Sequence, residues 1–164
     1  MAGPAPPLAT IGYEGTTVAA VLDQLRAARV ALLIDVRAVA ASRKPGFSKR
    51  QLAAELDAAG IAYVHLQQLG TPKPGRDAVR AGHPERMVPI FRDHMRGDRP
   101  QAELAQAIDL ARRSRACLLC FEHDHTTCHR TLVAELITGQ TGQSVTHLAV
   151  PLPPSSRGSP SASA

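Results

Sequence analysis

Residues with reactive side chains gather directly after one short apolar stretch, residues 116–121. Glu122 ends this stretch, and a polar segment rich in His, Asp and Thr leads to Cys128, His129 and Arg130, where a helical pattern begins. A thiol at a helix N-terminus beside an arginine has a lowered pKa, so Cys128 is a candidate nucleophile or redox thiol. The alternative is a small buried residue that packs the first helical turn. Glu122 is a candidate general acid or base, or a carboxylate that only orients His129 or Arg130.

Two further cysteines lie inside the apolar stretch. Cys117 and Cys120 form a Cys-x-x-Cys pattern, but residues three apart in a strand point to opposite faces of the sheet. We therefore interpret Cys117 as a core residue and Cys120, near the strand end, as a second candidate reactive thiol. A thiol-phosphatase loop would need an arginine at position 134, where the chain has Ala134.

The same segment holds five good zinc ligands: Cys120, His123, His125, Cys128 and His129. Their spacing fits no common zinc module, and the loop that carries them is short. The sequence therefore predicts no metal ligands and implies no particular cofactor. A cytosolic metal or thiol sensor stays open as a hypothesis.

Apolar stretches alternate with helical patterns along the chain, which predicts β-α-β units and a mainly parallel sheet. Strands are expected over residues 8–12, 31–36, 61–66, 116–121 and 144–150. Helices are expected over residues 18–29, 49–59, 84–95, 100–114 and 128–138, with a kink at Pro89 and an irregular, turn-rich segment from 69 to 83. The continuous apolar run over 31–36 indicates a strand that is buried on both faces.

Polar residues stand at the carboxyl ends of the expected strands. Tyr13 follows the first strand, Asp35 lies near the end of the second and Arg37 follows it, and His65 lies near the end of the third. In a parallel sheet these ends share one edge, where ligands bind, so we predict a pocket there. Asp35 and Arg37 are an acid and an anion-binding residue, or a salt-bridged pair that holds a loop.

A basic cluster follows the second strand and includes Arg43, Lys44, Lys49 and Arg50. It suits a phosphate-binding rim, although such clusters are also common on solvated surfaces. Neither a Gly-x-Gly-x-x-Gly motif nor a Walker loop is present, which argues against a dinucleotide or P-loop site.

The composition is that of a globular protein, with 44% hydrophobic and 20% charged residues. A net charge of +5 and a pI of about 9.6 suit an anionic small molecule or nucleic acid. We expect one α/β domain over 8–150, between a disordered leader (1–7) and a disordered Pro/Ser-rich tail (151–164). Three cysteines, no export signal and no apolar run of membrane-spanning length predict a cytoplasmic protein that does not enter a membrane.

Several motifs, in order, resemble the DUF488 family. They are Thr10-Ile-Gly-Tyr-Glu-Gly15, Ile34-Asp-Val-Arg37, Ser42-Arg-Lys-Pro-Gly-Phe-Ser-Lys49, Tyr63-Val-His-Leu66, Leu119-Cys-Phe-Glu122 and Cys128-His-Arg130. The resemblance runs from about Thr10 to Leu136, and one departure is that the Pro often found shortly after Asp-Val-Arg is absent. The resemblance implies a Rossmann-like three-layer sandwich with about five strands flanked by helices. It assigns no function, but it marks eight positions as family motif positions: Asp35, Arg37, Arg43, Cys120, Glu122, Cys128, His129 and Arg130.

Three functional hypotheses follow. The first is an enzyme that acts on a nucleotide, nucleoside or nucleic-acid base at the carboxyl edge of the sheet. The second is a non-catalytic binding module for a phosphorylated ligand or nucleic acid, and the third is the thiol or metal sensor. The candidate catalytic residues are Cys128, Glu122, Asp35 and Cys120, and the candidate ligand-binding residues are Tyr13, Arg37, Arg43, Lys44, His65, His129 and Arg130. The sequence assigns neither a substrate nor an oligomeric state.

Overall fold

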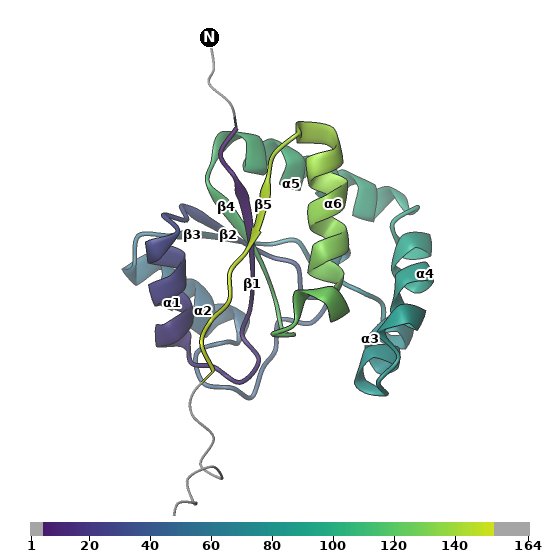
Figure 1. Cartoon of the computed structure of the whole chain (residues 1–164), viewed down its shortest axis with the longest axis horizontal. Coiled ribbons are helices and arrows are strands. Elements are labelled where there is room, and N and C mark those ends of the chain that lie inside the picture. Colours follow the sequence, from purple (N-terminus) through teal and green to yellow (C-terminus); the bar gives the residue numbers. More distant parts are fainter. Residues whose placement is uncertain (1–4, 153–164) are drawn as a thin grey trace, which may run out of the picture.

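The computed structural model describes residues 5–152. Within this range the strands are β1 (Leu8–Gly12), β2 (Leu32–Asp35), β3 (Ala62–His65), β4 (Ala116–Cys120) and β5 (Val145–His147). They form one five-stranded sheet in the order β3-β2-β4-β1-β5, and every neighbouring pair is parallel (Figure 1). The predicted parallel α/β sheet of about five strands is confirmed.

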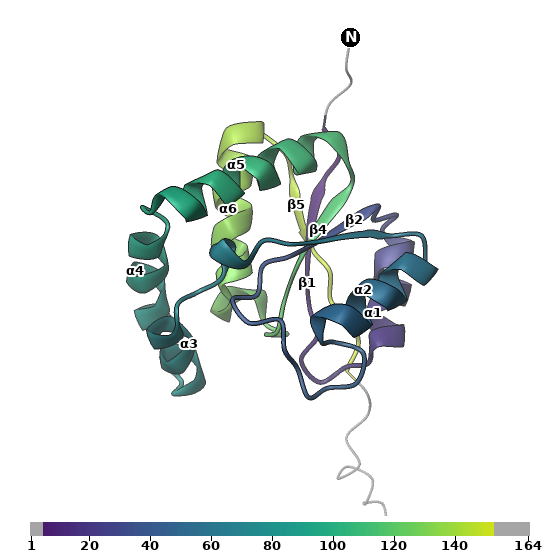
Figure 2. The same cartoon turned by 180° about the vertical axis from the view of Figure 1, so that it is seen from behind.

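Six α-helices connect the strands in the described part of the chain. They are α1 (Val18–Ala27), α2 (Lys49–Ala58), α3 (Lys73–Arg80), α4 (Pro84–His94), α5 (Asp98–Arg113) and α6 (His129–Thr141). Helices α1 and α2 lie on one side of the sheet and α5 and α6 on the other, as the two opposite views show (Figures 1 and 2). The result is a Rossmann-like three-layer fold.

Burial explains why these segments pair as they do. Every residue of β1, β2 and β4 is buried, because these strands lie between two helical layers. Successive side chains of β4 enter different cores. Cys117 packs in the core under α1 and α2, whereas Cys120 packs in the core under α5 and α6. The prediction that the two cysteines point to opposite faces of the sheet, with Cys117 in the core, is therefore confirmed, and Cys120 faces the layer that contains α6.

The main error of the sequence analysis concerns residues 69–83, which were predicted to be irregular. This segment contains the helix α3, which packs against α4. Pro74 lies in the first turn of this helix, where backbone N–H groups make no hydrogen bond within the helix, so proline is tolerated there. Lys73 forms an ion pair with Asp77, one turn later, at 2.9 Å. Helix α4 also continues through Pro89.

Most of the two predicted terminal segments cannot be compared with the structure. The expected disordered leader and tail lie outside the described residues, apart from positions 5–7 and 151–152. Between residues 5 and 152, none of the helices combines the length and the apolar character needed to cross a bilayer.

Candidate functional site

A cavity of about 670 Å³ opens at the carboxyl edge of the sheet. Its lining comes from the ends of β1, β2 and β4, from α3 and α4, and from the first residue of α6. The lining residues used below are Tyr13, Arg37, Thr71, Arg76, Arg80, Cys120, Phe121, Glu122 and His129. The pocket predicted from the strand ends is therefore present as a cavity.

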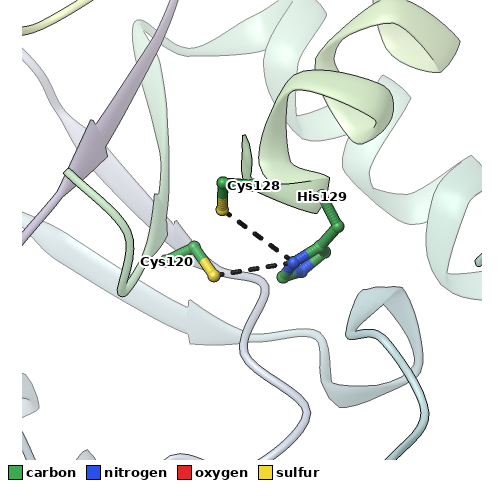
Figure 3. Close-up of side chains that lie close together, drawn as sticks. All are labelled: Cys120, Cys128 and His129. Carbon is green, nitrogen blue, oxygen red and sulfur yellow. Dashed lines mark hydrogen bonds between the residues drawn. The ribbon is translucent and has the colours of Figure 1, made fainter. Parts of the chain in front are cut away.

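Two cysteines and one histidine meet at this edge, and we call them the Cys2His cluster (Figure 3). Cys120 is the last residue of β4, Cys128 is the N-cap of α6, and His129 is the first residue of α6. Nδ1 of His129 lies 3.6 Å from Sγ of Cys120 and 4.0 Å from Sγ of Cys128. The exposed fractions are 5%, 2% and 6%, so the cluster is almost closed to solvent.

The orientation of the His129 ring is determined from the neighbouring strand. Its Nε2–H donates to the backbone carbonyl of Val36 at 2.8 Å, directly after β2. Because Nε2 carries this proton, Nδ1 is the nitrogen turned toward the two sulfur atoms.

The two thiols of the cluster have different acidities. Burial opposes ionisation of Cys128, but hydrogen bonds from Cys120 and His129, together with the charge of His129, lower its pKa well below the usual value. The hydrogen bond to Cys128 and burial raise the pKa of Cys120. Burial also opposes protonation of His129, yet the hydrogen bond and charge of Cys128 raise its pKa. These directions favour the thiolate at Cys128 over that at Cys120, and they favour the protonated ring of His129 beside it.

Glu122 lines the cavity two residues after Cys120. Burial raises the pKa of its carboxyl to about 7, and the nearby Cys128 adds to this effect. A carboxyl group with this pKa exchanges protons readily at neutral pH, which is what a general acid or base requires.

The side chain of Arg130 is buried and makes hydrogen bonds within the protein rather than facing the cavity. Its Nε donates to Oγ1 of Thr10 at 3.2 Å, and its two terminal nitrogens donate to the backbone carbonyls of Glu122 and His123. Its side chain is 1% exposed and is not part of the cavity lining among the described residues. Arg130 therefore holds the loop between β4 and α6.

Asp35 and Arg37 form a second buried group of contacts. Nε and one terminal nitrogen of Arg37 donate to the two carboxylate oxygens of Asp35 at 2.8 and 2.7 Å. The other terminal nitrogen of Arg37 donates to the hydroxyl of Tyr13 and to the carbonyl of Phe47. Tyr63 donates its hydroxyl to Asp35 at 2.6 Å. Arg37 and Tyr13 line the cavity, and Asp35 lies behind them.

The remaining predicted residues lie farther out. Nε2–H of His65 donates to the carbonyl of Arg37 at 2.7 Å and so holds the loop after β2. Arg43 is exposed and Lys44 half-buried. In the range that the structure describes, none of these three side chains lines the cavity.

Helix α3 contributes residues that the sequence analysis missed. Arg76 and Arg80 line the cavity, and Arg76 also donates to the carbonyl of Thr71 at 2.9 Å. Thr71 lines the cavity as well, and its buried hydroxyl has no hydrogen-bond partner among the described residues. The basic run of α3 was visible in the sequence, but its Pro and Gly residues suggested a loop.

Comparison with known proteins gives one result. A search of curated proteins and a search of solved structures both found no match. The family model described as "Domain of unknown function DUF488" matches residues 17–137, which is most of the chain and includes the Cys2His cluster, Glu122 and the Asp35–Arg37 pair. The chain therefore belongs to the DUF488 family.

Proposed function

We propose that this protein is an enzyme that acts on a nucleotide, nucleoside or nucleic-acid base bound in the carboxyl-edge cavity. The observation that carries the proposal is the position of Glu122 and the Cys2His cluster at one cavity whose walls offer both aromatic and arginine side chains. A cavity of about 670 Å³ lies within the range of small-molecule sites.

The aromatic wall supports a ligand with a planar ring. The chain has two Tyr, three Phe and no Trp, and two of these five aromatic residues, Tyr13 and Phe121, line the cavity. The Tyr13 ring is held by stacking on Phe47 at 4.3 Å, and Phe121 meets it edge-on at 5.4 Å. Phe121 is 44% exposed, so it offers a ring face on which a base could stack.

The arginines of α3 support an anionic group on the ligand. Among residues 5–152, Arg80 makes only an exposed contact with Asp77, at 3.6 Å, so its guanidinium is able to turn toward a phosphate. Arg37 also lines the cavity, but Asp35, Tyr13 and Phe47 occupy most of its N–H groups. The hydroxyl of Thr71, which has no hydrogen-bond partner in the described part of the chain, is available as a further polar contact.

The chemistry assigned to the site is acid–base chemistry. Glu122 and His129 both line the cavity, but both ring nitrogens of His129 are engaged, so Glu122 is the side chain that can exchange a proton with a bound ring or with a water beside it. Cys120 lines the cavity too, whereas Cys128 lies behind it and acts on the ligand through its neighbours.

The test is product formation from a panel of nucleobases, nucleosides and nucleotides, followed by liquid chromatography with mass detection. Wild type is compared with Glu122→Gln and with Glu55→Gln, which changes an exposed glutamate on α2 that is not among the described cavity-lining residues. Glu122→Gln is expected to lose roughly 10²- to 10⁴-fold in turnover while still binding the ligand, and Glu55→Gln is expected to match wild type.

Binding is measured separately by calorimetry with the same panel. Phe121→Ala is expected to weaken binding about tenfold or more through the loss of stacking. Binding without any product from any member would overturn the enzyme proposal in favour of a non-catalytic binding module. No binding at all would overturn the ligand class.

A further inference from the structure

We propose that Cys120, Cys128 and His129 bind one Zn²⁺ ion. The zinc site itself depends only on these three residues and their immediate surroundings. Its use in catalysis rests on the function proposed above.

The spacing of the ligand atoms matches a tetrahedral zinc site. Zn–S bonds of about 2.3 Å and Zn–N bonds of about 2.0–2.1 Å at a tetrahedral angle separate S and N by about 3.6 Å. In the structure the two S···N distances are 3.6 and 4.0 Å, and the three ligand atoms lie within 4.8 Å of one another. Figure 3 shows both sulfurs directed at the same ring nitrogen of His129. The longer S···N distance would need to shorten by about 0.4 Å to reach the tetrahedral value.

The surroundings orient the ligands as those of a metal site do. The Val36 carbonyl accepts the Nε2 proton of His129 and leaves Nδ1 to face the sulfurs, and a histidine ligand characteristically donates its other ring N–H in this way. The backbone N–H of Arg130 donates to Sγ of Cys128 at 3.5 Å, at the positive end of α6. These contacts favour a thiolate at position 128.

Charge and burial favour zinc at this position. Two thiolates neutralise the two charges of Zn²⁺, so the loaded site carries no net charge in its buried, largely apolar surroundings. Thiolate and imidazole ligands together select zinc over magnesium or calcium, which prefer oxygen.

The ligand set has three members and leaves one tetrahedral position. The two other histidines of the loop make other contacts. His123 donates to the carbonyl of Val150, and His125 stacks on His147 at 3.6 Å. Cys120 and His129 line the cavity, so we assign the fourth position to the cavity side, where Glu122 also lies. Three protein ligands and one open position are the pattern of catalytic zinc, which activates a bound water for attack.

The experiment uses the full chain, purified without chelator under reducing conditions. Its metal content is measured by plasma mass spectrometry, and chelator-treated protein is then titrated with Co²⁺. We expect about one zinc per chain as purified, and a cobalt complex with thiolate charge-transfer absorption and intense tetrahedral bands.

Three matched alanine variants locate the site. Cys120→Ala and Cys128→Ala are expected to weaken cobalt binding at least tenfold and to reduce the charge-transfer absorption. Cys117→Ala changes the third cysteine, which is also buried but lies on the other face of β4, and is expected to bind like wild type. Only variants with the circular dichroism spectrum of wild type are compared. If the two ligand variants do not fold, His129→Gln replaces them.

Two results would overturn the zinc site. One is reduced wild type that binds neither zinc nor cobalt, and the other is a Cys117→Ala variant that loses the metal as the ligand variants do. A Cys120–Cys128 disulfide in metal-free protein, with no metal uptake after reduction, would instead identify a redox pair. Because metal binding is measured without substrate, a zinc site with no turnover would refute only the enzyme proposal. Turnover by protein that takes up no metal would refute only the zinc site.

Discussion

The carboxylate of Asp35 and the guanidinium of Arg37 form a two-point ion pair across a single intervening residue, with exposed fractions of 0% and 4%. The same guanidinium holds Tyr13 and the carbonyl of Phe47. The pair therefore links the end of β2 to the aromatic wall of the cavity and to the loop before α2. Its first role is to hold this edge of the sheet together.

Breaking this pair is expected to be costly. Arg37→Met removes the positive charge and leaves the buried Asp35 carboxylate uncompensated, so we expect a loss of about 3–5 kcal/mol in the free energy of unfolding. The matched control is Arg113→Met, which breaks the exposed Arg113–Asp109 pair and should change stability by less than about 1 kcal/mol. Urea denaturation measures both. Equal losses in the two variants would show that burial of the Asp35–Arg37 pair contributes nothing.

The hydrogen bond from Tyr63 to Asp35 leads to a prediction about alkaline pH. Burial and the Asp35 carboxylate raise the pKa of Tyr63 above its ordinary value of 10.0. Below pH 10 the bond is intact, and Tyr63→Phe is expected to cost about 1.5–3 kcal/mol because it removes a hydrogen bond to a charged group. Above pH 10 the phenol ionises in the unfolded chain while it stays neutral in the folded protein, so wild type loses stability as pH rises.

The measurement is urea denaturation of wild type and Tyr63→Phe between pH 7 and 11. The stability advantage of wild type should be constant up to about pH 10, the reference pKa of tyrosine, and should shrink beyond it. An advantage that grows with alkaline pH would contradict the raised pKa.

Replacing two glycines by alanine is expected to change stability in opposite directions, because the space around them differs. A Cβ at Gly12, the last residue of β1, would lie 1.8 Å from the carbonyl oxygen of Glu122, which is backbone and has little room to move. Gly12→Ala is expected to cost about 3 kcal/mol or more by forcing the strand end and the loop apart.

The opposite effect is expected at Gly139, inside α6, where an added Cβ meets nothing within 4 Å. Gly139→Ala should raise stability by about 0.5–1 kcal/mol because alanine favours the helix. Thermal denaturation of both variants checks the pair. A tolerated alanine at position 12 would show that Glu122 and the end of β1 are not held in close contact.

The fold was largely predictable because its signals are local. The continuous apolar run of β2 and the alternation of side chains in β4 follow from burial between two helical layers. Helix α3 was missed because Pro and Gly dominate its first turn and resemble loop residues. The strand order, with β4 between β2 and β1, depends on contacts between segments far apart in the sequence, which the local pattern of apolar residues does not reveal.

The site was predictable in its composition and not in its arrangement. The polar residues at the strand ends predicted a site at the carboxyl edge of the sheet. Their spacing along the chain could not show that Cys120 meets Cys128 and His129. A loop and a 3₁₀ turn fold back to bring these residues together. The ring of His129 is oriented by Val36, which lies 93 residues away in sequence. Because helix α3 was missed, the contribution of Arg76 and Arg80 to the cavity wall was missed with it.

The proposed zinc ion also predicts a change in stability. A ligand that binds only the folded state stabilises it by about 2.7 kcal/mol at one hundred times its dissociation constant, which raises Tm by roughly 5–10 °C for a chain of this size. Zinc added to chelator-treated wild type and Cys117→Ala should raise Tm by this amount, each relative to its own metal-free form, and chelator should reverse the shift. Cys128→Ala should show little or no shift in Tm, because only two of the three protein ligands remain. Scanning calorimetry under reducing conditions measures the change. An equal shift in Cys128→Ala would place the bound zinc elsewhere on the chain.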